Sequence, residues 1–349
     1  MKLSKKLFCA LLAITIPASG VSCAYAQTDK PEPNKYQNIV KQCTAGIEKK
    51  PQNYSLYEKR ADAYYEMKNY AEAIKDFDVL IKEDPNTHET YFMRGNAKFA
   101  LKNYQGAIED FSKTIELEPN SVSAYLHRGT AYLLLKKNDE AIKDFDNVIK
   151  FDDKCYDAFC NRGIAKLHNK DYKNAIIDFD KAISIDNKIT DGYLERGHAK
   201  AYMKDFEGAI ADFKEVIKLD PKSVSAYYDM GSAKIQLKDL KGAKEDFDKS
   251  IALNNKFAPA YFNRAMIEYT DQNYEKAVKD YSVYISLVPD DAEAYNNRAL
   301  ARMHIGGETK NAIYDCLKAL KLNPDYLPRY QELDWLKYYL PKPVEETNQ

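Results

Sequence analysis

The chain has 349 residues, of which 45% are hydrophobic and 30% charged, a composition typical of a folded protein and unlike that of a disordered one. The formal net charge is −1 and no basic stripe stands out, which argues against a nucleic-acid partner. No nucleophile elbow, phosphate loop or pair of catalytic carboxylates is present. The sequence therefore predicts a protein that is not an enzyme, with no catalytic residues and no cofactor.

Residues 1–26 predict a signal peptide. Three lysines precede an apolar run over Leu7–Ile16, and the segment ends in Ala24-Tyr25-Ala26, with small residues where a signal peptidase reads. We therefore expect cleavage before Gln27 and an exported chain, periplasmic or secreted.

Lipid attachment at Cys23 is the alternative to cleavage. Gly20 disfavours it, because lipoprotein signals carry Leu at that place. Beyond the signal peptide no stretch is apolar enough to span a bilayer, so we expect no integral membrane segment in the mature chain.

Residues 27–35 predict a polar, proline-bearing linker. Residues 36–53 predict one helix whose apolar positions, Tyr36, Val40 and Ile47, recur 34 residues later at Tyr70, Ile74 and Ile81. This helix is interpreted as a half-repeat that caps the array described next.

From residue 54 to residue 326 the sequence repeats itself eight times with a period of about 34 residues, which is typical of a repeat array. In the second repeat, Tyr91, Gly95 and Phe99 lie on one face of a first helix. Ala107 and Phe111 lie on one face of a second helix, which Pro119 closes. The boundaries are roughly 54–87, 88–121, 122–155, 156–189, 190–223, 224–257, 258–291 and 292–326.

These residues resemble the tetratricopeptide repeat (TPR) family. Its signature places are occupied by Tyr91, Gly95, Tyr104, Ala107, Phe111 and Pro119. Two departures are Arg94, where the family more often has Leu, and Lys98, where it usually has Tyr. The resemblance implies an all-α solenoid, a right-handed superhelix of antiparallel helix pairs whose first helices line a concave groove that binds proteins.

The array is expected to end in a capping helix at 327–340, followed by a disordered tail at 341–349. Trp335, the only tryptophan, is assigned to the cap, with an exposed contact as the alternative.

An arginine and an aspartate recur 16 residues apart in six of the eight repeats. We interpret these pairs as a structural Arg/Asp ladder of internal salt bridges, because each arginine arrives with its own acid. The ladder includes Arg94 with Asp110, Arg128 with Asp144, and Arg162 with Asp178. In the sixth repeat Met230 replaces the arginine, so we predict that Asp246 is either exposed or bonded to Arg264.

The groove-facing positions lie at −5, −2, −1, +2, +5 and +6 from each ladder arginine. They are rich in apolar and aromatic side chains, which predicts a trough for a peptide or an amphipathic helix of unknown identity. Neighbouring repeats are expected to bury about half of this stripe. The predicted partner-binding residues are Phe92, Met93, Phe99, Leu126, His127, Leu133, Leu134, Ile164, Leu167, Tyr202, Tyr228 and Phe262.

A co-chaperone or enzyme-regulatory adaptor is the alternative function. Some members of the family clamp a chaperone's C-terminal carboxylate with lysine, arginine and asparagine. Here the −5 positions carry no cation, which disfavours that use. The export signal instead suggests a role in bacterial envelope assembly, and the oligomeric state stays open.

Four histidines fall at groove positions: His127, His168, His198 and His304. Their helical positions differ from repeat to repeat and no HExxH motif occurs, so no metal site is predicted and we expect solvated or ligand-contacting side chains. Cys43 and Cys316 replace a buried aromatic and are expected in the core. Cys155 and Cys160 lie on different sides of one helix, so no disulfide is predicted.

Overall fold

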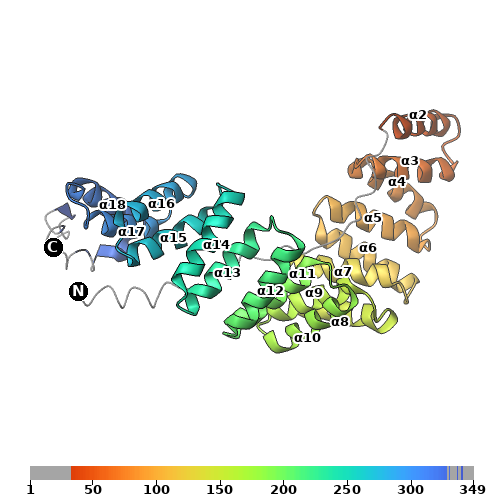
Figure 1. Ribbon diagram of the computed structural model, residues 1–349. Helices are drawn as coiled ribbons and strands as arrows, with labels where there is room; N and C mark the ends of the chain where they lie inside the picture. Colours follow the sequence, from red (N-terminus) through yellow and green to blue (C-terminus); the bar gives the residue numbers. More distant parts are fainter. Residues whose placement is uncertain (1–32, 328–329, 331–335, 337–338, 341–349) are drawn as a thin grey trace, which may run out of the picture. The chain divides into compact units, whose positions relative to one another are not determined.

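A computed structural model describes residues 33–327, 330, 336 and 339–340 (Figure 1). Every regular element among these residues is helical, which confirms the predicted all-α fold. The helices are α2 (Pro33–Lys49), α3 (Tyr54–Glu66), α4 (Tyr70–Glu83), α5 (His88–Ala100), α6 (Tyr104–Leu117), α7 (Val122–Leu134), α8 (Asn138–Phe151), α9 (Tyr156–His168), α10 (Tyr172–Ile185), α11 (Thr190–Tyr202), α12 (Phe206–Leu219), α13 (Val224–Gln236), α14 (Leu240–Leu253), α15 (Ala258–Thr270), α16 (Tyr274–Leu287), α17 (Ala292–Arg302), α18 (Thr309–Leu322) and the short 3₁₀ helix η1 (Pro324–Tyr326).

The described helices divide into two compact units, one holding α2 to α11 and the other α12 to η1. Within each unit, every helix packs against the next one in the chain. In the first unit, neighbouring first helices also contact each other, α5 with α7, α7 with α9, and α9 with α11. Helices α5, α7, α9 and α11 therefore lie side by side as one layer.

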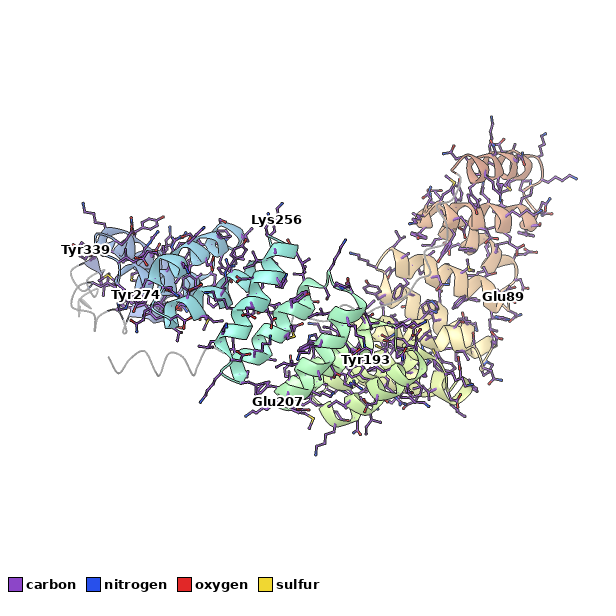
Figure 2. All side chains as sticks on the ribbon, viewed as in Figure 1. Glu89, Tyr193, Glu207, Lys256, Tyr274 and Tyr339 are labelled. Carbon is purple, nitrogen blue, oxygen red and sulfur yellow. The ribbon has the colours of Figure 1, made fainter. Side chains whose placement is uncertain are left out.

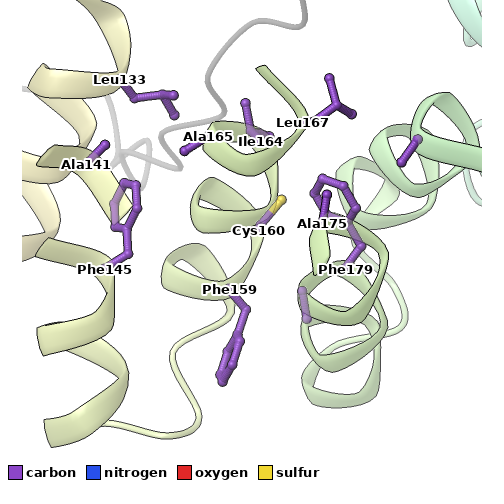
Figure 3. Close-up of a cluster of buried hydrophobic side chains, with 12 residues drawn as sticks. Leu133, Ala141, Phe145, Phe159, Cys160, Ile164, Ala165, Leu167, Ala175 and Phe179 are labelled. Atoms are coloured by element: carbon purple, nitrogen blue, oxygen red, sulfur yellow. The ribbon is translucent and has the colours of Figure 1, made fainter. Parts of the chain in front are cut away.

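In several repeats, a glycine on the first helix lets an aromatic ring of the second helix approach closely. A Cβ added to Gly163 of α9 would lie 2.6 Å from Cε1 of Phe179 on α10. Phe179 and its counterpart Phe145 on α8 are both fully buried. Figure 3 shows these two rings on either side of α9, which carries Phe159, Cys160 and Ile164 in the same cluster. Because this packing recurs in successive repeats, their buried side chains form a continuous core.

The turn between the two helices of a repeat is set by one residue with left-handed backbone. After α5, the Lys102 amide donates to the Phe99 carbonyl at 2.8 Å and the Asn103 amide to the Lys98 carbonyl at 2.9 Å, a Schellman motif. The left-handed residues are Lys68, Lys102, Lys136, Lys170, Lys204, Lys238 and Gln272, with φ between 58° and 65°. The eighth repeat, which is one residue longer than the others, uses Gly307 with φ 85°.

We predict that Lys136→Gly raises the free energy of unfolding by about 0.5 kcal/mol. Glycine removes the steric cost of a left-handed side chain, of about 1 kcal/mol, and part of that gain is lost to the freer unfolded chain. Lys143→Gly in the exposed interior of α8 is the matched control and lowers it by about 1 kcal/mol. Urea titrations compare the variants, and equal destabilisation by the two changes would contradict the assignment.

Each end of the array is covered by further residues of the chain. Helix α2 begins at Pro33, inside the expected linker, and packs against α3 with Cys43 buried. At the other end, Tyr330 and Leu336 are buried in a cluster with Tyr295 and Cys316. The predicted signal peptide, most of the linker and the capping helix, Trp335 and the tail lie outside the described residues. Within the described part, no helix combines the length and apolar character that crossing a membrane requires.

Candidate functional site

The ladder arginines lie between consecutive repeats. The Arg162 guanidinium donates to both carboxylate oxygens of Asp178, at 2.9 and 2.6 Å, and to Asp146 of the preceding repeat at 2.6 Å. It also stacks on the Phe159 ring, 5.4 Å from the ring centroid. Arg94 makes the corresponding contacts with Asp110 and Asp78, and Arg128 with Asp144 and Ser112.

These arginines are already satisfied by their own chain. Burial alone would lower the pKa of the Arg162 guanidinium, but its hydrogen bonds to Asp178 and Asp146 raise it. Asp178 itself is only 2% exposed. The geometry is that of a bidentate ion pair between a buried aspartate and a partly buried arginine, and it joins three helices, α8, α9 and α10.

A second cation, which the sequence-based predictions do not include, binds the same aspartates. One turn after the arginine, Lys98 lies 2.8 Å from Asp110 and Lys166 lies 2.7 Å from Asp178, measured from Nζ to Oδ2. The signal was present in the departure of Lys98 from the family pattern. A lysine at that place brings a second positive charge to the buried carboxylate.

This lysine explains why the prediction for Asp246 is wrong. Asp246 is 6% exposed, and Lys234 of its own repeat lies 2.7 Å away. Arg264 instead binds Asp280 and Asp248. In the seventh repeat the charge at the place of this lysine is of the opposite sign. Glu268 stands there and is paired with Lys244 of the sixth repeat.

The predicted partner-binding residues divide by burial. Leu133, Ile164, Leu167 and Tyr228 are at most 8% exposed and pack in core clusters, so they are structural. Tyr202 is 42% exposed and stacks on Tyr172 with ring centroids 5.1 Å apart. The remaining seven are half-buried: Phe92, Met93, Phe99, Leu126, His127, Leu134 and Phe262.

One ring contact joins the half-buried residues of α5 and α7. The Phe92 ring meets His127 edge-on, with centroids 5.3 Å apart, and His127 also lies 5.7 Å from Phe111. Burial lowers the pKa of His127, whose Nδ1 lies 2.7 Å from the Ser123 carbonyl. We call the five apolar residues Phe92, Met93, Phe99, Leu126 and Leu134 the α5–α7 apolar surface.

The other histidines have different surroundings. His198 is 2% exposed beside Glu195, with Nδ1 3.3 Å from Oε2, so the expectation that it is solvated is wrong. His304 stacks on Tyr274, which is labelled in Figure 2, at 4.3 Å. His168 is exposed. Cys43 and Cys316 are buried, as predicted, and Cys155 and Cys160 are free thiols.

All the family models that match the chain describe the same kind of repeat. Models described as tetratricopeptide repeat or TPR repeat match residues 54–87, 95–136, 122–155, 156–189, 197–238, 224–257 and 262–326. No curated protein matches the chain.

Solved structures with the same fold come from several bacteria. The C-terminal part of a TPR repeat-containing protein from Cytophaga hutchinsonii is 20% identical, covers 68% of this chain and 97% of its own, and has a TM-score of 0.58. A tetratricopeptide repeat protein from Parabacteroides merdae is 14% identical, with 77% and 99% covered and a TM-score of 0.57. PilF of Pseudomonas aeruginosa is 19% identical, with 62% and 96% covered and a TM-score of 0.52. With this shared fold and the matches that run through all eight repeats, the chain belongs to the tetratricopeptide repeat family.

Proposed function

We propose that the protein is an exported, non-enzymatic scaffold that binds a protein or peptide partner on the first helices of its repeats. The observation that carries this proposal is the α5–α7 apolar surface. Its five side chains are only half-buried, whereas the helix-pair core is filled by the Gly95 and Phe111 types of residue. Apolar side chains left accessible on neighbouring helices suit a docked helix or extended peptide.

The ladder arginines are assigned a structural role in this proposal. Arg94, Arg128 and Arg162 each bind an aspartate of their own repeat and a side chain of the preceding repeat. A partner would have to break a buried ion pair to reach them, which costs several kcal/mol. Recognition is therefore placed on the apolar surface and on the groove positions beside it.

The proposal of export rests on the lysines and the apolar run of residues 1–26. From this export signal we also propose a role in assembling the bacterial envelope. The N-terminal sequence of the protein recovered from its host gives a direct check. A mature chain that begins at Gln27 supports export by cleavage. A lipid on Cys23 would replace it with membrane anchoring, and an intact Met1 on all of the protein would contradict both.

Crosslinking in the native host, followed by mass spectrometry, tests partner binding. We expect the triple change of Phe92, Leu126 and Leu134 to Ser to remove most crosslinked partners. The matched control changes three exposed apolar residues of the same unit that lie outside this surface, Leu101, Phe151 and Ile177, to Ser and keeps the partners. Circular dichroism verifies that both variants stay helical. An unchanged partner set in the first variant would refute the surface assignment.

A further inference from the structure

Acidic side chains concentrate on the groove positions of the unit that holds α2 to α11. The thirty groove positions of α3, α5, α7, α9 and α11 include seven acids, whereas Lys59 is their only lysine and they have no arginine. The whole chain, in contrast, carries 52 basic and 53 acidic residues. Six of these acids are Glu58, Asp62, Glu66, Glu89, Asp157 and Asp191, and the seventh, Glu195, is buried beside His198.

The groove acids lack the cations that the ladder aspartates have. Within the described residues, no lysine or arginine lies at ion-pair distance from Glu58, Asp62 or Asp157. Glu89, labelled in Figure 2 on the first turn of α5, pairs with His88 at 3.2 Å, and no lysine or arginine of the described part of the chain lies at ion-pair distance from it. Asp110 in the core, by comparison, is paired with both Arg94 and Lys98. Negative charge on this surface is therefore not compensated by the fold itself.

Like charges are also crowded together on these helices. Glu58, Asp62 and Glu66 follow one another at intervals of four residues, so they lie on one side of α3. Burial and these two glutamates raise the pKa of Asp62. Burial and Asp191 on α11 raise the pKa of Asp157 on α9. A cation placed among them would relieve a repulsion that the free protein carries.

A buried amide supplies an independent observation on the same surface. Asn96 holds in α5 the place that Asp62 holds in α3, and it lies on the same side of its helix as Phe92 and Phe99. Its side chain is 7% exposed, and its Oδ1 accepts no hydrogen bond within the described part of the chain. An orphaned buried acceptor is costly, so this oxygen is suited to an N–H donor of a ligand.

We infer that the partner is a basic amphipathic peptide whose apolar middle binds the α5–α7 apolar surface while lysines or arginines on either side meet the acids of α3 and of α9 and α11. The inference rests on the proposed function and names the chemistry of its ligand. The order of the helices carries the argument, because acids occupy the groove positions on both flanks of the apolar residues. Peptide N–H groups at the centre reach the free oxygen of Asn96.

Fluorescence anisotropy with three labelled peptides tests the inference on the full chain. The peptides share an apolar core and differ only at their ends, which carry paired lysines, glutamines or glutamates. We expect the lysine peptide to bind about tenfold more tightly than the glutamine peptide, and the glutamate peptide to bind least. The lysine preference should fall several-fold between about 50 mM and about 300 mM salt, because exposed charges are screened.

Matched variants locate the effect. Changing Glu58, Asp62 and Glu66 to Gln, Asn and Gln should remove most of the lysine preference, whereas changing the exposed Glu48, Glu109 and Glu140 to Gln should not. Equal binding of the lysine and glutamine peptides, or equal effects of the two variants, would overturn the inference. If the peptides bind without a preference for lysine, and the change of Phe92, Leu126 and Leu134 to Ser abolishes their binding, the inference fails but the proposed function stands. The two failures are therefore distinguishable. Failure of all three peptides would overturn the inference and leave the crosslinking result to decide the function.

Discussion

Replacing Phe179 by alanine will lower the free energy of unfolding by about 4 kcal/mol, because a fully buried ring is lost and a cavity remains. The ring lies directly against the Gly163 backbone, and its cluster extends into α7 and α8. Neighbouring helices cannot close the gap without moving the Arg162 ion pairs that join α8, α9 and α10. Urea titration gives the change, and hydrogen exchange should show that the loss of protection is largest in α9 and α10.

The control for Phe179 lies on the same helix. Ile177 is 62% exposed, so Ile177→Ala should change the free energy of unfolding by less than about 0.5 kcal/mol. A second variant tests the close approach. Gly163→Ala should be costly in the wild type, where the new Cβ meets the ring, and nearly free in the Phe179→Ala background. Equal costs in the two backgrounds would contradict the packing described for Gly163.

Replacing Arg162 by methionine will lower the free energy of unfolding by about 3 kcal/mol, because it leaves Asp178 buried without its bidentate partner. Lys166 remains 2.7 Å from Asp178 and limits the loss. Adding Lys166→Ala should therefore cost more than the sum of two isolated changes, because the carboxylate then has no cation. A double-mutant cycle measured by urea titration gives this coupling.

The sixth repeat explains what such a replacement needs. Met230 is tolerated because Lys234 holds Asp246. The residue 16 before Met230 is also Lys214, which needs no arginine, whereas Arg94 and Arg162 bind Asp78 and Asp146 at that place in the repeat before their own. The control for Arg162→Met is Lys143→Met on α8, an exposed position where we expect a change below about 0.5 kcal/mol. If both methionine variants were equally stable, the ladder would have no structural role.

The repeat period made the fold predictable from the sequence, because spacing alone places Gly95 and Phe111 on facing helices. It also paired each ladder arginine with the aspartate of its own repeat. The bond from Arg162 to Asp146 could not be read in this way, since it depends on how one repeat stacks on the next. The bond from Lys234 to Asp246 could not be read from the 16-residue spacing either, because this lysine lies one turn after the place of the arginine.

Burial on the groove side was the least predictable feature. The positions of Leu133, Ile164 and Leu167 show which side of a helix they occupy, but not how closely α7, α9 and α11 approach one another. The structure brings these helices into contact and buries the three side chains, whereas Phe92 and Leu126 stay half-buried. The sequence pattern shows which face of a helix a residue occupies, but burial on that face also depends on the distance to the next helix, which the pattern does not give.

Each ladder arginine binds side chains of two neighbouring repeats. Deleting one whole repeat would therefore, at most places, bring together two repeats that can form equivalent bonds. Deleting residues 122–155, for example, would place Arg162 beside Ser112, the side chain that Arg128 binds now. The joint before the sixth repeat is different, because an arginine brought there would face Lys214 instead of an acceptor. Deleting residues 224–257 would bring Arg264 to that place, so this deletion should destabilise the chain more than the deletion of 122–155.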